Sequence, residues 1–242
     1  MFAIFKRELH SYFTTITGYV FLAVSLAISG FVLGLTTLMF KTSDTSLYFI
    51  IMTFLLIIIM PILTMKIFSD EKRTKTEQLL LTSPISVSSM VVGKFLAAFC
   101  MFVISTLISV INFLIVFHYS IAETYRELGP NIALLMGNMI AMLLLGMAFI
   151  AIGIFISSLT ENQFAAVIIT IAVLFGMLLI NLFSNLVKVK FIKVALSWIS
   201  VYGRFSNFSR GLFDIPAIIY YISIAGIFLF LTVRVFESRR YR

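Results

Sequence analysis

The sequence predicts an all-α polytopic membrane protein with six transmembrane helices, an N-terminal interfacial helix and a short helix in a polar insert between spans two and three. Of its 242 residues, 61% are hydrophobic and 12% are charged, about half the charged fraction of soluble domains. The apolar residues form six long runs, each close to the ~20 residues that cross the hydrocarbon core of a bilayer. Backbone groups find no hydrogen-bond partner in lipid, so these runs must be helices.

The charge and the reactive residues exclude several functions. The net charge of +8 comes from basic residues scattered around the spans. This distribution indicates that the basic residues determine the orientation of the spans in the membrane and do not bind nucleic acid. Gly93-Lys94 lacks the surrounding pattern of a P-loop. Cys100 is the single cysteine, and His10 and His118 lie far apart in the sequence. We therefore expect no catalytic residue, metal site or cofactor on this chain.

Residues 1–15 predict a separate helix that lies in the membrane interface. Phe2, Phe5, Leu9 and Phe13 recur at helical spacing on one face. The charged residues of this stretch lie mostly off that face, as in helices that rest among lipid headgroups. The alternative is a simple extension of the first span. The first apolar run is too long for a cleavable signal peptide.

The six spans follow in order. Pro61 is expected to kink the second, and the turn at Glu161-Asn162 is so short that the fourth and fifth must be antiparallel neighbours. A count of basic residues gives 11 on the side of the termini and 7 on the other, so both termini are predicted to be cytoplasmic. The spans cover residues 17–40, 47–68, 90–117, 131–159, 164–187 and 216–236.

Small and polar residues inside the spans suggest two further roles. Small residues at every fourth position favour close helix packing, and polar ones either line a translocation path or hydrogen-bond between helices. The predicted packing residues are Gly30, Gly34, Ala133, Gly137 and Ala141, and the predicted path residues are Tyr19, Ser25, Ser29, Thr36, Thr53, Asn181 and Ser184.

The polar insert, residues 69–94, is the longest stretch that a soluble partner could bind. Ser69 or Asp70 is expected to end the second span in water. Thr74 and Glu77 have the spacing of a capping box, and Pro84 stops the helix that follows. We therefore predict a short helix over residues 75–81. Its three leucines, residues 79–81, favour docking on a partner, with burial in the membrane interface as the alternative.

Residues of the insert resemble the ABC type-2 exporter permeases. Their signature matches Asp70-Glu71-Lys72-Arg73 and the residues after it, and Val92-Gly93-Lys94-Phe95-Leu96-Ala97 resembles their third span. Arg204-Phe205, Phe208, Arg210-Gly211, Asp214 and the ending Glu237-Ser238-Arg239-Arg240 are similar to the gliding-motility and nitrous-oxide-reductase-maturation branch. Many relatives have glycine where this chain has Lys75. The signature residues after Arg73 are Thr76, Glu77, Leu79, Leu80, Thr82 and Pro84.

The resemblance implies a single permease domain over residues 1–242 in a bacterial cytoplasmic membrane. Residues 69–89 would form the coupling loop and 188–215 an extracytoplasmic segment with short helices. The implied partners are a cytoplasmic ABC ATPase that holds ATP and Mg²⁺, a second identical or homologous permease, an accessory membrane subunit and the lipid bilayer. The implied ATPase-coupling residues are Asp70, Glu71, Lys72, Arg73, Thr76, Glu77, Leu79, Leu80 and Leu81.

Three functions remain open at this point. The first is the membrane-spanning permease of an ATP-driven exporter, which moves its substrate by alternating access. The second is a membrane anchor or assembly scaffold for the ATPase, and the third is a passive channel. The spans hold few ionisable residues, which favours transport that is powered by another subunit.

Overall fold

The computed structural model describes residues 1–39, 45–78, 85–121, 131–186, 203–205, 208 and 214–240, and side chains within them except those of 38, 115–121 and 181–186. All elements in these ranges are helical, which confirms the predicted fold class. They are α1 (Phe2–Thr14), α2 (Ile16–Leu33), η1 (Gly34–Leu38), α3 (Ser46–Thr64), α4 (Ser69–Arg73), α6 (Val87–Ile121), α7 (Ile132–Leu159), α8 (Gln163–Leu186) and α11 (Ile215–Arg240).

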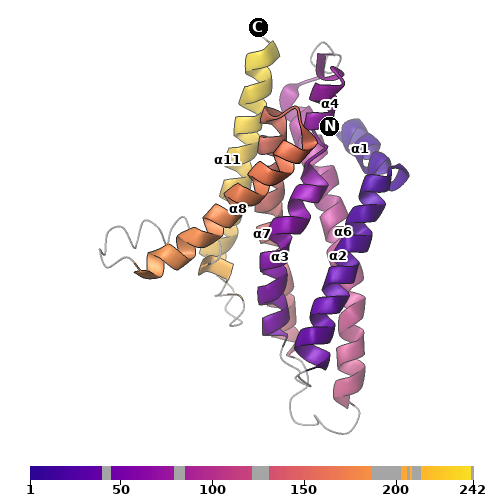
Figure 1. Cartoon of the computed structure of the whole chain (residues 1–242), viewed down its shortest axis with the longest axis vertical. Helices are drawn as coiled ribbons and strands as arrows, with labels where there is room; N and C mark the ends of the chain where they lie inside the picture. Colours follow the sequence, from indigo (N-terminus) through magenta and orange to yellow (C-terminus); the bar gives the residue numbers. More distant parts are fainter. Residues whose placement is uncertain are drawn as a thin grey trace.

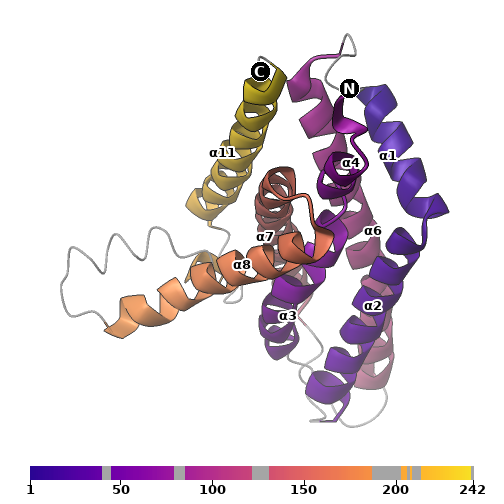
Figure 2. The same ribbon diagram turned by 45° about the horizontal axis from the view of Figure 1, so that its top comes forward.

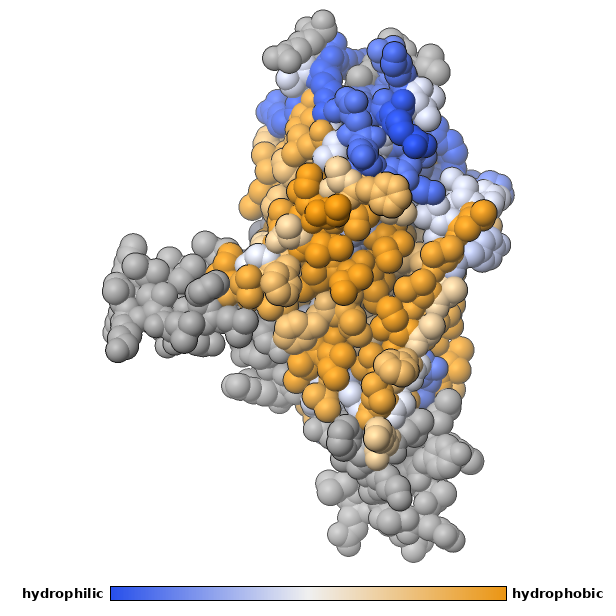
Figure 3. Space-filling model, in the orientation of Figure 1, coloured by the Kyte–Doolittle hydropathy of each residue, from blue (hydrophilic) through white to orange (hydrophobic). Residues whose placement is uncertain are grey.

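Six helices in the described part of the chain are long and apolar enough to cross a membrane. α2 with η1 forms the first span, and α3 with α4 the second; α6, α7, α8 and α11 form the others. Figure 3 shows an apolar surface over the middle of the molecule and hydrophilic side chains at one end. The chain is therefore a multi-pass membrane protein.

α7 is the centre of the bundle. It packs against α3, α6, α8 and α11, and 72% of its most apolar window is buried, against 17% for α8. Asn131 is the N-cap of α7, because its side chain accepts hydrogen bonds from the backbone N–H groups of Ala133 and Leu134. α8 runs obliquely, and its far end leaves the other helices (Figures 1 and 2).

α1 is a helix of its own, as predicted, and not an extension of the first span. Thr15 separates it from α2 with extended backbone angles, φ −99° and ψ 151°. Gly18 permits the sharp bend, because a Cβ there would overlap the Tyr12 carbonyl. Ile4 is the buried residue of α1, whereas Phe2 and Phe13 are exposed.

Both termini lie at the same end of the bundle, together with α1 and α4 (Figure 1). We call this end, formed by α1, residues 65–78, the start of α6, the α7–α8 turn and the end of α11, the polar end. An even number of crossings returns the chain to the side on which it starts. The polar insert, whose described residues are 69–78 and 85–94, lies at the polar end with the termini.

Candidate functional site at the polar end

The first part of the polar insert continues the second span instead of leaving it. α4 begins at Ser69, which is fully buried, so the prediction that this residue ends the span in water is wrong. Ser157 of α7 fixes the start of α4, because its hydroxyl accepts hydrogen bonds from the backbone N–H groups of Phe68 and Ser69 at 3.2 and 3.1 Å. The same hydroxyl donates to the carbonyl of Met65.

The predicted helix over residues 75–81 starts later than expected. Lys75 has a φ of 60°, a left-handed conformation that glycine adopts without strain and that cannot begin an α-helix. The hydroxyl of Thr74 bonds the carbonyl of Asp70 at 2.8 Å, so it closes α4 and does not form the predicted capping box. Helical backbone resumes at Glu77, and residues 79–84 lie outside the described residues.

Lys94 is a buried cation where the insert returns to the bundle. Its side chain is 2% exposed, and its Nζ lies 2.6 Å from Glu71 Oε1 and 3.6 Å from Glu8 Oε1. It also donates to the carbonyl of Ile67 at 2.9 Å and lies 4.8 Å from the centre of the Phe68 ring. A buried charge is stable only when it is paired and hydrogen-bonded, so Lys94 fastens α6 to α1 and α4.

α1 is held against the spans by further contacts. Gly93 lets α1 approach α6 closely, since a Cβ there would lie 3.2 Å from Ile4. The hydroxyl of Tyr12 donates to the carbonyl of Leu63 in α3 at 3.4 Å, and within α1 itself Arg7 pairs with Glu8 at 2.7 Å. Burial, and secondarily the charge of Glu8, raises the pKa of the Tyr12 phenol, so this donor keeps its proton at physiological pH.

The far side of the insert is tied to the other spans. Arg239 near the end of α11 lies 3.0 Å from Glu77 and donates to the carbonyl of Ser158 at 2.8 Å. Gln163 at the start of α8 donates to Asp70 at 2.7 Å. Lys72 lies 3.2 Å from Glu161 in the α7–α8 turn. Residues 69–78 therefore contact, directly or through one side chain, five other helices.

The predicted coupling residues divide into two groups. Asp70, Glu71, Lys72 and Glu77 are half-buried and bind other parts of the chain. Arg73 and Thr76 are exposed, whereas the leucines at 79–81 lie outside the described residues. That these residues couple to an ATPase stays a prediction. Sequence reasoning did not predict which residues of the chain these side chains contact, because ion pairs between distant segments leave no local spacing pattern. The unpredicted contact residues are Glu8, Lys94, Ser157, Glu161, Gln163 and Arg239.

Two predicted path residues meet other polar side chains inside the bundle. Ser25 bonds Ser105 at 2.6 Å, and Ser29 bonds Tyr48 at 2.8 Å. The cavity beside Ser25 and Ser29 measures about 20 Å³, enough for one water molecule. Asn138 of α7, which sequence reasoning missed, is fully buried without a hydrogen-bond partner in the described structure.

The remaining predicted path residues are not gathered there. Thr36 and Thr53 bond carbonyls four residues earlier in their own spans at 2.8 Å, and Tyr19 is 59% exposed on the outer surface of α2. Asn181 and Ser184 belong to α8, but their side chains lie outside the described residues. A role for any of these residues in a translocation path stays a prediction.

The packing residues differ from those expected. An added Cβ at Gly30 or Gly34 meets nothing within 4 Å, and Ala133 is exposed, so within the described chain these three do not mark helix contacts. Ala141 is buried, and Gly137 approaches the Phe208 carbonyl. The glycines that permit close packing are instead Gly18, Gly93, Gly146 and Gly153.

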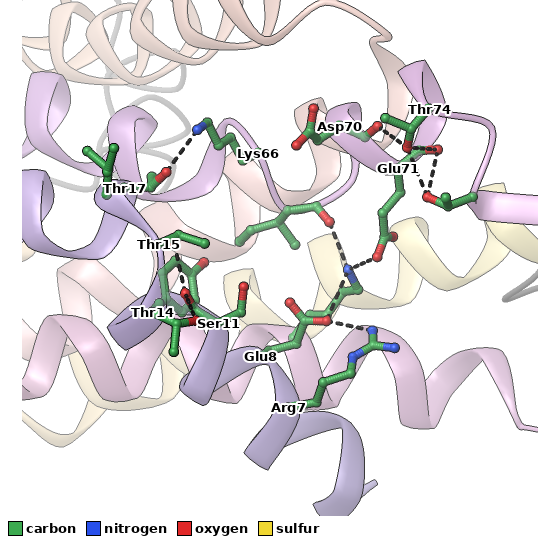
Figure 4. Close-up of a pocket in the computed structure, with 15 residues that line it drawn as sticks. Arg7, Glu8, Ser11, Thr14, Thr15, Thr17, Lys66, Asp70, Glu71 and Thr74 are labelled. Carbon is green, nitrogen blue, oxygen red and sulfur yellow. Dashed lines mark hydrogen bonds and ion pairs between the residues drawn. The ribbon is translucent and has the colours of Figure 1, made fainter.

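A pocket of about 920 Å³ opens beside the Lys94 ion pairs, between α1 and the α3–α4 junction (Figure 4). Basic, acidic and hydroxyl side chains all line it, among them Lys66, Asp70 and Ser11. No group of three or more metal-binding side chains occurs in the described residues. At the polar end, therefore, one short segment, residues 69–78, contacts most helices of the bundle.

Comparison with known proteins agrees with a transport role. A search of curated proteins found no match. The family model of the ABC-2 family transporter proteins matches residues 19–200, which include the polar insert and the first five spans except the first three residues of the first span. This family supplies the membrane component of ABC transporters, and its members generally dimerise and work with an ATPase subunit. The chain belongs to the ABC-2 family of transporter membrane proteins.

Proposed function

We propose that this chain is the permease of an ATP-driven exporter, and that a separate cytoplasmic ATPase acts on the polar end to drive alternating access. Family membership supports the transport role. The observation that carries the coupling site is the network of ion pairs and hydrogen bonds around residues 69–78. Together with the Lys94–Glu8 pair and the hydrogen bonds to Ser157, those contacts join the segment to α1, α6, α7, α8 and α11.

The network gives the exposed and the half-buried residues of the segment different tasks. Arg73, Thr76 and Gln78 present an exposed surface for the ATPase. The half-buried acids transmit a movement of residues 69–78 to the spans. A push on the segment moves α11 through Arg239 and α6 through Lys94. Binding of the ATPase shifts the spans only if it favours one of their arrangements over another.

The polar end faces the cytoplasm in this proposal. Both termini lie at this end (Figure 1), and the distribution of basic residues favours placing them inside. The membrane is the bacterial cytoplasmic membrane. ATP and Mg²⁺ are held by the partner, so this chain supplies positions and surfaces but no catalytic group.

Two copies of the permease, or one copy and a homologue, enclose the substrate path. Inside one copy the cavity at Ser25 and Ser29 has room for about one water molecule, so those residues do not border an open path in this conformation. Gly30 on α2 is exposed, and an added Cβ at Gly30 or at Gly34 of η1 would meet nothing within 4 Å among the described residues. Small residues let two membrane helices approach closely, so this face is proposed to meet the second copy.

Substitution of Arg239 tests the coupling route. In proteoliposomes that contain the permease and the ATPase that copurifies with it, we expect Arg239→Ala to lower permease-stimulated ATP hydrolysis about tenfold, because a charged hydrogen bond of ~1.4 kcal/mol or more is lost. Arg234→Ala is the matched control, since Arg234 pairs at 3.0 Å with Glu237 of its own helix. Equal rates for the two variants would contradict the route through α11.

A further inference from the structure

The pocket at the polar end is built from four segments, one of which is α6 with Lys94. The last turn of α1 contributes Ser11, and the start of α2 contributes Thr17. The α3–α4 junction contributes Lys66 and Asp70. Its volume of about 920 Å³ lies within the range of about 300–1,000 Å³ that is typical of small-molecule sites. The Lys94 pairs and the α1–α2 bend shape it, so the folded chain forms this pocket without a partner.

One wall of the pocket presents the Lys66 ammonium group, and the other presents carboxylate oxygens. Lys66 is exposed, and its Nζ donates to the hydroxyl of Thr17 at 2.8 Å. It lies in no ion pair within the described part of the chain, so its charge is available to an anion. The opposite wall holds the carboxylates of Glu8 and Glu71, which both face Lys94. Glu8 also pairs with Arg7 at 2.7 Å. Figure 4 shows Lys66 with Thr17 on one side and the glutamates on the other.

We propose that this pocket binds the headgroup of a phospholipid that carries both a phosphate and a primary amine, such as phosphatidylethanolamine. The phosphate would accept hydrogen bonds from Lys66 and Thr17, which are charge-assisted and therefore strong. The ammonium would donate hydrogen bonds to the carboxylate oxygens of Glu8 and Glu71. A choline headgroup has no N–H to donate there, and a headgroup without an amine offers these carboxylates no ammonium donor.

The surroundings of the pocket favour a lipid over a soluble phosphate compound. Immediately beyond Thr17, α2 exposes Tyr19 at 59% and Val20 at 44%, and Ile16 at the pocket rim is 81% exposed. α2 starts at the polar end, and Figure 3 shows that the hydrophilic end borders an apolar belt. Acyl chains of a lipid held by its headgroup would run along this face of α2. A basic side chain at such a depth is placed to meet lipid phosphates.

Native mass spectrometry of the full chain tests the proposal. The protein is released from nanodiscs of equal parts phosphatidylethanolamine, phosphatidylcholine and phosphatidylglycerol, and the lipids that remain bound are weighed. We expect phosphatidylethanolamine to be retained about tenfold over the other two. Lys66→Met should lower that retention about tenfold, as the loss of one charged hydrogen bond predicts, and Lys66→Arg should keep most of it.

Lys6→Met is the matched control, because Lys6 is an exposed lysine of α1 that does not line the pocket; it should retain lipid like the wild type. A second arm adds soluble glycerophosphoethanolamine in excess, which should not displace the lipid. Equal retention by Lys66→Met and the wild type, or no preference among the three lipids, would overturn the site. Displacement by the soluble headgroup would overturn the lipid as its ligand. None of these outcomes depends on an ATPase, so they are separate from the proposed coupling.

Discussion

Replacing Lys94 with methionine is expected to lower the free energy of unfolding by about 3 kcal/mol. The substitution removes the cation that Glu71 and Glu8 share at 2.6 and 3.6 Å. Breaking a buried pair from one side costs about 3–5 kcal/mol, because the other charge stays buried without compensation. The two glutamate side chains are 20% exposed, which places the expected loss at the lower end. Titration with a denaturing detergent measures it.

A second substitution separates the ion pair from the packing of the lysine stem. If charge is the cause, Lys94→Met combined with Glu71→Gln should be about 1 kcal/mol more stable than Lys94→Met alone, since the double variant buries one charge fewer. Lys6→Met, at an exposed position of α1, should leave stability unchanged. A loss below about 1 kcal/mol for Lys94→Met would show that the buried cation does not hold α1, α4 and α6 together.

Gly146→Ala is expected to destabilise the protein by about 2 kcal/mol, as overpacking in a dense core does. A Cβ at this position of α7 would overlap the ring of Phe102 on α6. Phe102 is 3% exposed and has little free space into which it could move. Thermal unfolding in detergent measures the effect.

Gly226→Ala on α11 is the matched control, because an added Cβ there meets nothing within 4 Å. Alanine favours a helix more than glycine does, by up to about 1 kcal/mol, so this variant should be as stable as the wild type or slightly more so. Equal destabilisation by the two variants would contradict the close approach of α6 and α7 at Gly146.

The sequence predicted the helical class and the six spans because both follow from hydrophobic length alone. The break after α1 was also predictable, since residues 1–15 have an amphipathic pattern that the first span lacks. The start of the short helix after α4 was placed too early, because capping-box spacing at Thr74 and Glu77 ignores backbone angles. The left-handed Lys75 stands where the resemblance to the exporter permeases implies a glycine, and that departure was the available signal.

The ion pairs of the polar end could not be predicted from the sequence. Glu71 and Lys94 are 23 positions apart, and Glu77 and Arg239 are 162 apart, so no helical period relates them. A lysine inside an apolar run was the one local sign, because an ionisable residue at such a position requires a partner. The contacts of the glycines could not be predicted for a related reason: spacing of small residues shows which faces can pack closely, but not which neighbour is present.

The central claim is that the polar end lies on the ATP-containing side of the membrane, where a partner can push residues 69–78. Labelling with a membrane-impermeant maleimide tests it most directly, in a background in which the single Cys100 is replaced by alanine. Gln78→Cys is placed at the polar end, and Met39→Cys, at a 73% exposed residue, is placed at the opposite end. We predict that inverted membrane vesicles label Gln78→Cys and not Met39→Cys, and that right-side-out vesicles do the reverse. Labelling of Gln78→Cys from the outside would contradict the account.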